Sequence, residues 1–304
     1  MPELPEVESL RLGLGRKIVG QKIKSVKILN GKIVSSNSNC RKINPNKIRE
    51  FSENLANKKI VKLKRIAKNL ILELEDKSLI IIHLKMTGQL VFQDWQNKKT
   101  IGGHPILESY KLNLPNKHTH LIFSLNQGKL FYNDIRKFGY VLYYRTMAEA
   151  LKAGHFKNLG PDPFAKNFTK KYLGENLKKK NKSLKTVLLE QKVVSGCGNI
   201  YSDEICHAAQ INPRRQAKSL NPREVKFLYQ NIKKIFRQAI KAGGSSVSNY
   251  LLADGSKGNY AKRHKVYQKA GEICQTRKCK KHKNKIQRTI HAGRSTFFCA
   301  FCQK

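Results

Sequence analysis

The spacing of apolar residues changes once along this 304-residue chain, near residues 159–164 (LGPDPF), and this change most limits its possible folds. Before it, short apolar stretches alternate with turn-forming sequences such as Asn30-Gly31. After it, apolar residues recur at the three- and four-residue spacings of helices. Because LGPDPF is rigid and prone to turns, we interpret it as part of a linker. The pattern predicts an α+β protein of more than one domain, with strands first and helices afterwards.

The part before the linker is expected to form an antiparallel β-sandwich, because many short strands with tight turns are typical of that architecture. The expected strands are residues 22–29, 59–66, 70–74, 79–84, 121–125, 130–132 and 139–144. Two segments, residues 35–46 and 94–116, have the composition of long loops.

A short helix is expected over residues 5–15, ahead of the strands. It would carry Val7, Leu10 and Leu14 on one face and end at Gly13 and Gly15. Packed against the sandwich, this helix would hold residue 2 at the rim.

Three helices are expected after the linker. The first is marked by Leu184, Val187 and Leu188, and Asn199 is well placed to cap the second. The third would open at Asn221-Pro222 and stop at Gly243-Gly244. Its apolar face would be Val225, Leu228, Ile232, Ile235, Phe236 and Ala239.

Four of the seven cysteines form two pairs near the C-terminus, Cys274-x4-Cys279 and Cys299-x2-Cys302, with nineteen residues between the pairs. Two cysteine pairs with such a spacer strongly indicate a structural zinc site with four thiolate ligands. Since closed four-cysteine sites are seldom catalytic, we interpret this one as the scaffold of a small basic β-ribbon. His282 is the reserve ligand.

The opening residues MPELPEVE carry unusual chemistry. Removal of Met1 would leave Pro2 with a secondary α-amine, and α-amino groups have a pKa near ~8, against ~10.4 for lysine. Such an amine is partly uncharged at neutral pH, and its attack on a sugar C1′ would leave an iminium that permits elimination. Glu3 and Glu6 share a helix face and could supply an acid and a base. The alternative is a plain helix cap, because Pro5 and acidic residues suit a first helical turn.

Basic residues greatly outnumber acidic ones: 61 Lys and Arg stand against 20 Asp and Glu, a formal net charge of +41. Such a surplus favours a polyanionic partner, and nucleic acid is the first expectation. The chain is also rich in Asn and Ile, so a compositional bias of the genome is a second cause of the lysine content. We divide the surplus between the two causes.

The sequence shows neither a membrane span nor a secretory signal. Its longest strongly apolar run, residues 79–82, is far too short for a bilayer. The acidic start lacks the basic and apolar regions of a signal peptide. Cys40, Cys197 and Cys206 are scattered, which is typical of a reducing compartment rather than of a disulfide framework. We therefore expect a cytoplasmic protein.

Eight motifs distributed along the chain together carry a specific resemblance. They are PELPEVE, KRIAKNLILEL, IIHLKMTG, KHTHL, DIRKFG, LGPDPF, VVSGCGNIYSDE and GRSTFFCAFCQK. Over nearly its whole length the chain resembles the bacterial formamidopyrimidine-DNA glycosylases, also called 8-oxoguanine DNA glycosylases. The resemblance implies an N-terminal β-sandwich, a helix–two-turn–helix domain and a C-terminal zinc finger, with DNA in the cleft between. It also implies a bacterial, nucleoid-associated monomer.

The activity implied by the resemblance is excision of oxidised purines from duplex DNA, followed by strand cleavage, with one structural zinc ion and no redox cofactor. Pro2 matches the Schiff-base nucleophile, Glu3 the acid that assists opening of the deoxyribose, and Glu6 a neighbour that orders the site. Lys68 matches a lysine assigned to phosphate contact and β-elimination. Arg294 matches a finger arginine that grips phosphate and is credited with δ-elimination. Outside their motifs, both basic residues would be taken as ordinary surface charges.

Met86, Arg136 and Phe138 match side chains that fill the space left by a flipped base. Extruding a base costs a few kcal/mol, and apolar or planar wedges offset part of that cost. The alternative for Met86 and Phe138 is an ordinary place in the core. Further matches to DNA-contacting positions are His118, Lys180, Lys185 and Asn199. Their alternatives are a structural histidine, solvated lysines and a plain N-cap.

Residues 245–260 resemble the loop that closes over the damaged base, and Tyr260 is expected to stack there. The expected division is residues 1–150 for the catalytic sandwich, 151–168 for the linker, 169–261 for the helix–two-turn–helix domain with this loop, and 262–304 for the zinc finger. The chain departs from the family in the four-residue spacing within the first cysteine pair, in the longer, more basic segment 94–116 and in Cys197, where the family has an apolar residue.

Three alternatives stay open. A sister enzyme resembling endonuclease VIII prefers oxidised pyrimidines, but Leu4 and the set Met86, Arg136 and Phe138 argue against it. A non-catalytic DNA-binding protein of the same fold would not need Pro2 or the other catalytic matches. A basic zinc-ribbon protein that binds RNA would explain the charge but not the N-terminus.

Overall fold

A computed structural model describes residues 1–35, 43–103, 113–245 and 258–304. It divides into two compact units, Met1–Lys157 with Gly243–Asn259, and Asn158–Ala242 with Tyr260–Lys304. The first unit is built mainly of antiparallel strands and the second mainly of helices, so the expected α+β fold class is confirmed. The boundaries expected at residues 151, 169 and 262 stay a prediction.

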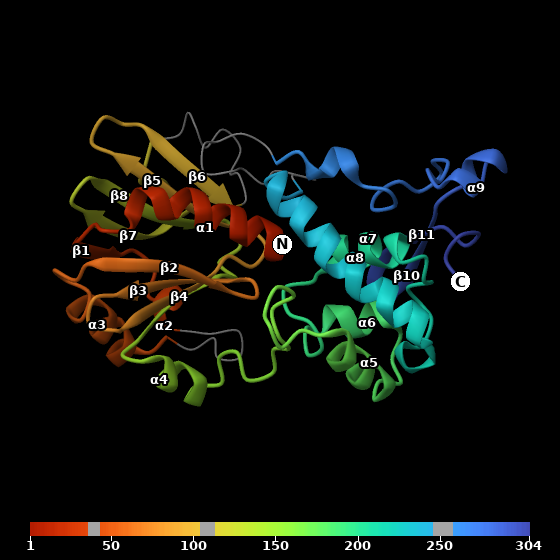
Figure 1. The fold of residues 1–304 in the computed structure, drawn as a ribbon. Coiled ribbons are helices and arrows are strands. Elements are labelled where there is room, and N and C mark those ends of the chain that lie inside the picture. The colour runs from red at the N-terminus through yellow and green to blue at the C-terminus, as the bar shows by residue number, and fades with distance from the viewer. Residues whose placement is uncertain (36–42, 104–112, 246–257) are drawn as a thin grey trace. The chain divides into compact units, whose positions relative to one another are not determined.

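Two antiparallel sheets form the first unit, one with the order β1-β7-β8-β5-β6 and the other with the order β2-β3-β4-β9. The strands are β1 Ile23–Ile28, β2 Ile60–Ile66, β3 Asn69–Leu74, β4 Leu79–His83, β5 Gly88–Asp94, β6 Lys99–Gly103, β7 Thr119–Leu125, β8 Gly128–Asp134 and β9 Tyr140–Tyr144. The helices are α1 Leu4–Ile18, α2 Lys32–Ser35, α3 Pro45–Glu53 and α4 Met147–Lys152. Helix α1 contacts strands of both sheets, as Figure 1 shows.

Apolar residues on opposite faces of β4 serve two different cores. Ile80 and Ile82 point into the main core with α1 and both sheets, whereas Leu79 and Ile81 pack with Ala150 of α4 in a second core. Because successive strand residues face opposite sides, a strand covered on both sides becomes a continuous apolar run. This explains the sequence LIII at residues 79–82.

Helix α1 runs past the glycines that were expected to end it, so that expectation is wrong. The helix continues to Ile18, and Gly20, with φ +90°, follows its end. Leu14 and Ile18 are fully buried, and their burial outweighs the cost of about 1 kcal/mol for each glycine inside a helix. In β6, a Cβ on Gly102 would overlap Leu10 Cδ1, so glycine lets the helix pack closely on the sheet.

All seven expected strands are present, but two further strands, β5 and β6, were missed. Strand β6 lies inside residues 94–116, where only a loop was expected. Helix α3 begins at Pro45, inside the other expected loop, residues 35–46, and was not predicted. Residues 36–42, with Cys40, and residues 104–112 lie outside the described residues.

The second unit contains the three expected helices, here α6, α7 and α8. Its helices are α5 Lys170–Lys178, α6 Leu184–Leu189, α7 Asn199–Ala208, α8 Pro222–Lys241 and α9 Arg277–Lys281, with 3-10 turns at Ala217–Ser219 and Tyr260–Arg263. Helix α8 buries the six apolar residues that its periodicity predicts. Asn221 and Glu224 form a capping box at its start, and Gly243 follows its end with φ +77°.

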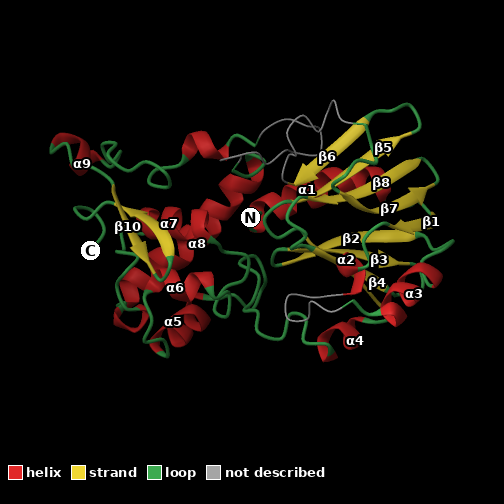
Figure 2. Ribbon diagram, turned by 180° about the vertical axis from the view of Figure 1, so that it is seen from behind, coloured by secondary structure: helices red, strands yellow, loops and turns green. Residues whose placement is uncertain are grey.

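A two-stranded antiparallel ribbon, β10 Gln287–His291 and β11 Arg294–Phe298, lies beside α7 in the second unit (Figure 2). Among the described residues, no helix combines the length and the apolar character that crossing a membrane requires.

Candidate functional site

The start of α1 buries two carboxylates. Glu3 and Glu6 are 3% and 2% exposed, and Pro2 beside them is also buried. Glu6 Oε2 accepts a 2.9 Å hydrogen bond from the backbone N–H of Glu3, which is the N-cap residue, so Glu6 does cap the helix. A cap accounts for Glu6, but it gives no reason for the burial of Pro2.

Glu6 also holds a segment that is distant in the sequence. Its Oε1 accepts a 2.7 Å hydrogen bond from the backbone N–H of Ser245, in the same unit. Gly244 has φ +82°, and a Cβ there would stand 2.7 Å from Glu6 Oε1. Only glycine therefore lets this backbone approach the carboxylate without strain.

The terminal amine lies among three ionisable side chains. Burial lowers the pKa of the Met1 α-amino group below its usual value of 8.0; the charges of Glu3 and Glu6 oppose the shift, and the charge of Lys68 adds to it. Lys68 is only 4% exposed, which is unusual for a lysine. The structure thus brings Lys68 close to Glu3 and Glu6, which precede it by more than sixty residues in the sequence.

His83 and Lys85 are neighbours of Lys68 that sequence reasoning missed. His83 Nδ1 accepts a 2.9 Å hydrogen bond from the backbone N–H of Lys85. Burial lowers the pKa of both side chains, and the charge of Lys68 lowers both further. Two lysine side chains as close together as Lys68 and Lys85 favour an anion such as phosphate. Both residues lie in the motif IIHLKMTG, which therefore held the signal.

Met86, Arg136 and Phe138 come together on the surface of the first unit. The Arg136 guanidinium lies 4.5 Å from the centroid of the Phe138 ring, and one of its nitrogens lies 3.4 Å from Met86 Sδ. Met86 is 45% and Phe138 48% exposed, so neither belongs to the core. These three residues, hereafter the wedge, form an exposed apolar and planar cluster.

Asp134, which sequence reasoning did not single out, fixes the turn that carries Arg136 and Phe138 of the wedge. It is fully buried, and its carboxylate accepts hydrogen bonds from the backbone N–H of Arg136 at 3.1 Å and of Gly139 at 2.8 Å. The hydroxyls of Thr87 and Tyr132 donate to the same carboxylate. A buried charge that accepts this many hydrogen bonds is stabilised where it lies, and so is the turn around it.

His118 is half-buried in the first unit, where its backbone N–H donates to Asn116 Oδ1 at 2.9 Å. In the second unit, Lys180 is half-buried after α5 and Arg294 is exposed at the first position of β11. These positions are compatible with the DNA contacts expected of them, which stay predictions.

Asn199 is not the N-cap that we expected, because the cap is Gly198 and Asn199 is the first residue of α7. Its Oδ1 is buried and has no hydrogen-bond partner among the residues that the structure describes. The residue remains at a helix N-terminus, where free backbone N–H groups favour an anion.

Lys185 was expected to contact DNA directly, but the structure buries its side chain. Its side chain is 1% exposed, and Nζ lies 2.8 Å from Asp203 Oδ1 and donates to the backbone oxygen of Ser295 at 2.9 Å. Burial raises the pKa of Asp203 to about 7, although the Lys185 charge opposes the shift. The lysine therefore joins α6, α7 and β11 inside the second unit instead of facing a ligand.

Tyr260 was expected to stack in the loop that closes over the damaged base, but it is buried. Its ring is 2% exposed and packs 5.8 Å from the rings of both Tyr201 and His264, measured between centroids. A ring enclosed in this way cannot stack on a DNA base without leaving its own core. Most of the expected loop, residues 246–257, lies outside the described residues.

Cys274, Cys279, Cys299 and Cys302 form one group that can bind a metal ion. Their Sγ atoms all lie within 4.8 Å of one another, with 3.5 Å between Cys279 and Cys299 and 3.8 Å between Cys274 and Cys302. A tetrahedral zinc ion with Zn–S bonds of about 2.3 Å needs sulfurs about 3.8 Å apart, so the group fits. The four residues between Cys274 and Cys279 lead into the short helix α9, which carries Cys279.

His282, the reserve ligand, does not belong to this group. It is exposed, and its ring packs against Phe301 with 5.7 Å between centroids.

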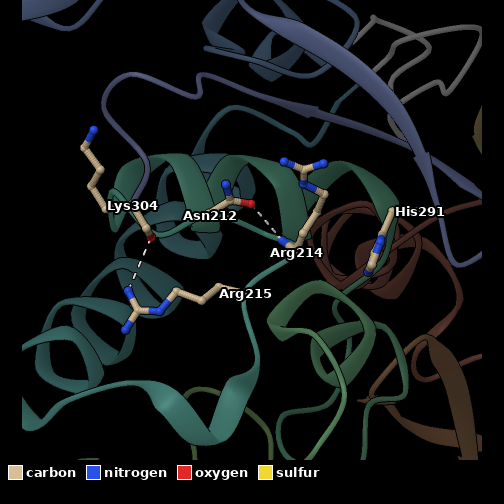
Figure 3. Close-up of a pocket in the computed structure, with 5 residues that line it drawn as sticks. All are labelled: Asn212, Arg214, Arg215, His291 and Lys304. Carbon is tan, nitrogen blue, oxygen red and sulfur yellow. Dashed lines mark hydrogen bonds between the residues drawn. The ribbon is translucent and has the colours of Figure 1, made fainter.

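A basic cavity of about 450 Å³ lies elsewhere on the second unit, lined by Asn212, Arg214, Arg215, His291 and Lys304. Arg215 is already paired with Glu224 and donates to the backbone oxygen of Lys304 at 3.3 Å (Figure 3). The charged ends of Arg214, Arg215 and Lys304 lie apart from one another in the same view. The cavity therefore has basic walls but no convergent set of donors, and it is not the candidate site.

Two family models match most of the chain. The formamidopyrimidine-DNA glycosylase N-terminal domain matches residues 1–141, and the formamidopyrimidine-DNA glycosylase H2TH domain matches residues 159–250.

Curated proteins and solved structures agree with these matches. The formamidopyrimidine-DNA glycosylases of Carboxydothermus hydrogenoformans and Ligilactobacillus salivarius are each 36% identical to the chain, covering 100% of it and 100% and 99% of their own lengths. Lactococcus lactis Fpg, solved with DNA containing an abasic site, superposes with a TM-score of 0.83 at 32% identity, covering 99% of both chains. MutM, solved with DNA containing carbocyclic 8-oxo-G, gives a TM-score of 0.82 at 34% identity over 100% of both chains.

Proposed function

Since the chain belongs to the formamidopyrimidine-DNA glycosylase family and is a DNA-repair glycosylase of that type, we propose that it excises oxidised purines from duplex DNA through Pro2. The substrates would be chiefly 8-oxoguanine and formamidopyrimidines, and strand cleavage would follow at the resulting abasic site. Such an enzyme works on chromosomal DNA, so its expected location is the cytoplasm.

The observation that carries the proposal is the burial of Pro2 and Glu3 at the start of α1, next to the charge of Lys68. These surroundings lower the pKa of the Met1 α-amine. A Pro2 amine left there by removal of Met1 would likewise be more fully unprotonated, and only that form is a nucleophile. A simple N-cap would need neither the buried amine nor the buried lysine.

In the proposed mechanism, the Pro2 nitrogen bonds to C1′ and gives up its proton, while the electron pair of the N-glycosidic bond leaves with the base, which takes up a proton. Glu3 donates a proton toward the ring oxygen, the sugar opens and the C1′–N bond becomes a cationic iminium. Loss of a proton from C2′ then expels the 3′-phosphate, and a second elimination expels the 5′-phosphate. Water releases the sugar fragment from Pro2, and a one-nucleoside gap with phosphate ends remains.

Lys68 and Arg294 would bind the phosphates on either side of the opened sugar and assist the two eliminations. His83, Lys85, His118, Lys180 and Asn199 are further candidates for phosphate contacts. Contacts of this kind make affinity strongly dependent on salt. The wedge would fill the space that the flipped nucleotide leaves in the duplex.

The metal bound by the four cysteines would be zinc, in a structural role. All four ligand positions are taken by thiolates, so no position is open for substrate. Metal analysis after denaturation should find one zinc ion per chain, and a chain that carries no metal would contradict this assignment.

Trapping with borohydride tests the proposed function. Reduction of the iminium should give a covalent complex with duplexes that contain 8-oxoguanine or a formamidopyrimidine, and a weaker one with thymine glycol. Preferential trapping on thymine glycol would instead indicate an enzyme for oxidised pyrimidines. Complete absence of trapping and nicking in a single-turnover assay would indicate a DNA-binding protein without catalysis.

A further inference from the structure

One face of helix α7 carries three buried polar side chains that bind the metal-binding part of the second unit. Asp203, Glu204 and His207 are 0%, 1% and 6% exposed. Asp203 and His207 are four residues apart and so lie on the same side of the helix. Burying such groups is costly unless each has a partner.

Each of the three has its partner in the segment that carries the cysteines. Asp203 Oδ2 accepts a 3.0 Å hydrogen bond from the backbone N–H of Phe297 in β11. The carboxylate of Glu204 accepts from three successive backbone N–H groups, those of residues 265–267, at 2.9 to 3.0 Å. His207 Nε2 lies 3.3 Å from Cys274 Sγ.

The partner of His207 differs from the other two because Cys274 belongs to the four-cysteine group. A sulfur that binds a metal is a thiolate and can only accept a hydrogen bond, so the imidazole must donate. One zinc ion with four thiolates carries a net charge of about −2, and three of the four cysteines here are buried. A donor aimed at one sulfur reduces the cost of burying that charge.

We propose that His207 is an outer-shell donor to the metal centre, with its Nε2–H hydrogen-bonded to the thiolate of Cys274. Metal retention in the finger then depends on α7, the helix whose first residue is Asn199. The proposal rests on the four-thiolate zinc site proposed above. His207 is a positioning residue here, since it orients a ligand and does not bind the metal itself.

The test compares two variants of His207 with a control in the same finger. His207→Phe keeps a planar ring but removes the donor, whereas His207→Gln keeps an N–H near the same place. His282→Gln is the control, because this histidine also lies in the cysteine segment but is exposed and packs on Phe301. The measurements are the rate of zinc release to a chelator from the folded protein and the charge-transfer band of the cobalt-substituted protein.

His207→Phe should release zinc about tenfold or more faster, in line with the usual effect of losing an outer-shell partner. Its sulfur-to-cobalt charge-transfer band should move to lower energy, since a thiolate without a hydrogen bond gives up its electron more easily. His207→Gln should lie between His207→Phe and the wild type, and His282→Gln should match the wild type. Equal release rates and bands for His207→Phe and His282→Gln would overturn the proposal.

Nuclear magnetic resonance of the zinc-loaded wild type keeps the proposal testable if His207→Phe does not fold. Long-range proton–nitrogen correlations should show the His207 ring protonated at Nε2, and a ring protonated only at Nδ1 would overturn the proposal. A wild-type protein that binds no metal at all would instead refute the zinc site, which separates the two failures.

Discussion

Two regions of the first unit depart from the usual distribution of residues between core and surface, and they do so in opposite ways: the site at the start of α1, hereafter the N-terminal site, and the wedge. The N-terminal site buries groups that normally face water, Glu3, Glu6 and Lys68. The wedge exposes Met86 and Phe138, which normally lie inside. In the proposed mechanism, burial would tune an amine for bond formation in the first region, and exposure would offer apolar surface to the duplex in the second. Substitutions in the two regions should therefore impair different steps of one reaction.

The largest effect is expected at the amine. Retention of Met1, or the substitution Pro2→Gly, should reduce covalent trapping to background, because each removes the buried secondary amine. Binding to a duplex with a non-cleavable abasic analogue should persist, since the wedge is unchanged. Trapping at the wild-type level with Met1 retained, measured by gel shift under denaturing conditions, would contradict the amine mechanism.

Glu3→Gln should come next. Loss of a proton donor in the transition state typically costs about 10²–10⁴-fold in rate. Single-turnover excision of 8-oxoguanine should fall by that amount, while affinity for the duplex changes little. Equal losses of excision rate and of affinity would mean that Glu3 contributes to DNA binding and not to proton transfer.

Gly244→Ala should impair the site through Glu6. The new Cβ would stand 2.7 Å from Glu6 Oε1, and misplacement of a site residue can cost up to about 10²-fold in rate. Gly20→Ala is the matched control, because Gly20 also has a positive φ, +90°, but a Cβ there would have no neighbour within 4 Å. Both variants should lose about 1–2 kcal/mol of stability in thermal unfolding, but only Gly244→Ala should lose activity.

Met86→Ala and Phe138→Ala should impair extrusion of the base from the duplex and leave the bond-breaking steps unchanged. Since base extrusion costs a few kcal/mol, losing one wedge side chain should slow excision from a paired duplex by about tenfold. Strand cleavage at an abasic site already made should hardly change. Leu151→Ala removes an equally exposed side chain from α4 and should leave both rates intact. Slower cleavage at the abasic site would assign the wedge to the chemistry.

The smallest expected effect is a shift in pH dependence. Burial lowers the pKa of the Met1 α-amine from 8.0, and the positive charge of Lys68 lowers it further. We expect the same direction for the Pro2 amine once Met1 is removed. The amine reacts only when unprotonated, so trapping should rise with pH, with its midpoint below pH 8. Lys68→Met should raise the amine pKa and shift the profile to higher pH, whatever it does to the maximal rate. An unchanged midpoint would mean that the lysine charge does not reach the amine.

The sequence predicted most of the framework because burial there follows periodicity. The buried face of α8 is the set of six residues that its spacing indicates. Glycines hid the true end of α1 and the strands β5 and β6 from the sequence pattern. Gly88, Gly102 and Gly103 weaken the strand pattern, but they lie where the backbone or Leu10 passes too close for a side chain.

The candidate site was harder to predict, because charge and partner choice depend on packing. Lys185 and Lys68 both follow from sequence motifs, but only the structure shows that Asp203 holds the first inside the second unit. Asp134 belongs to no periodic pattern in the sequence. Its importance comes from four donors that converge on it, from Thr87 just before β5, from β8 and from the turn that carries Arg136 and Phe138. Neither case could be inferred from residue spacing alone.

The central claim is that the reacting nitrogen is the imino nitrogen of Pro2. After borohydride reduction with an 8-oxoguanine duplex, nuclease digestion and proteolysis, mass spectrometry should find the sugar remnant on the N-terminal peptide, attached to Pro2. A remnant on Lys68 or on any other internal lysine would contradict the account.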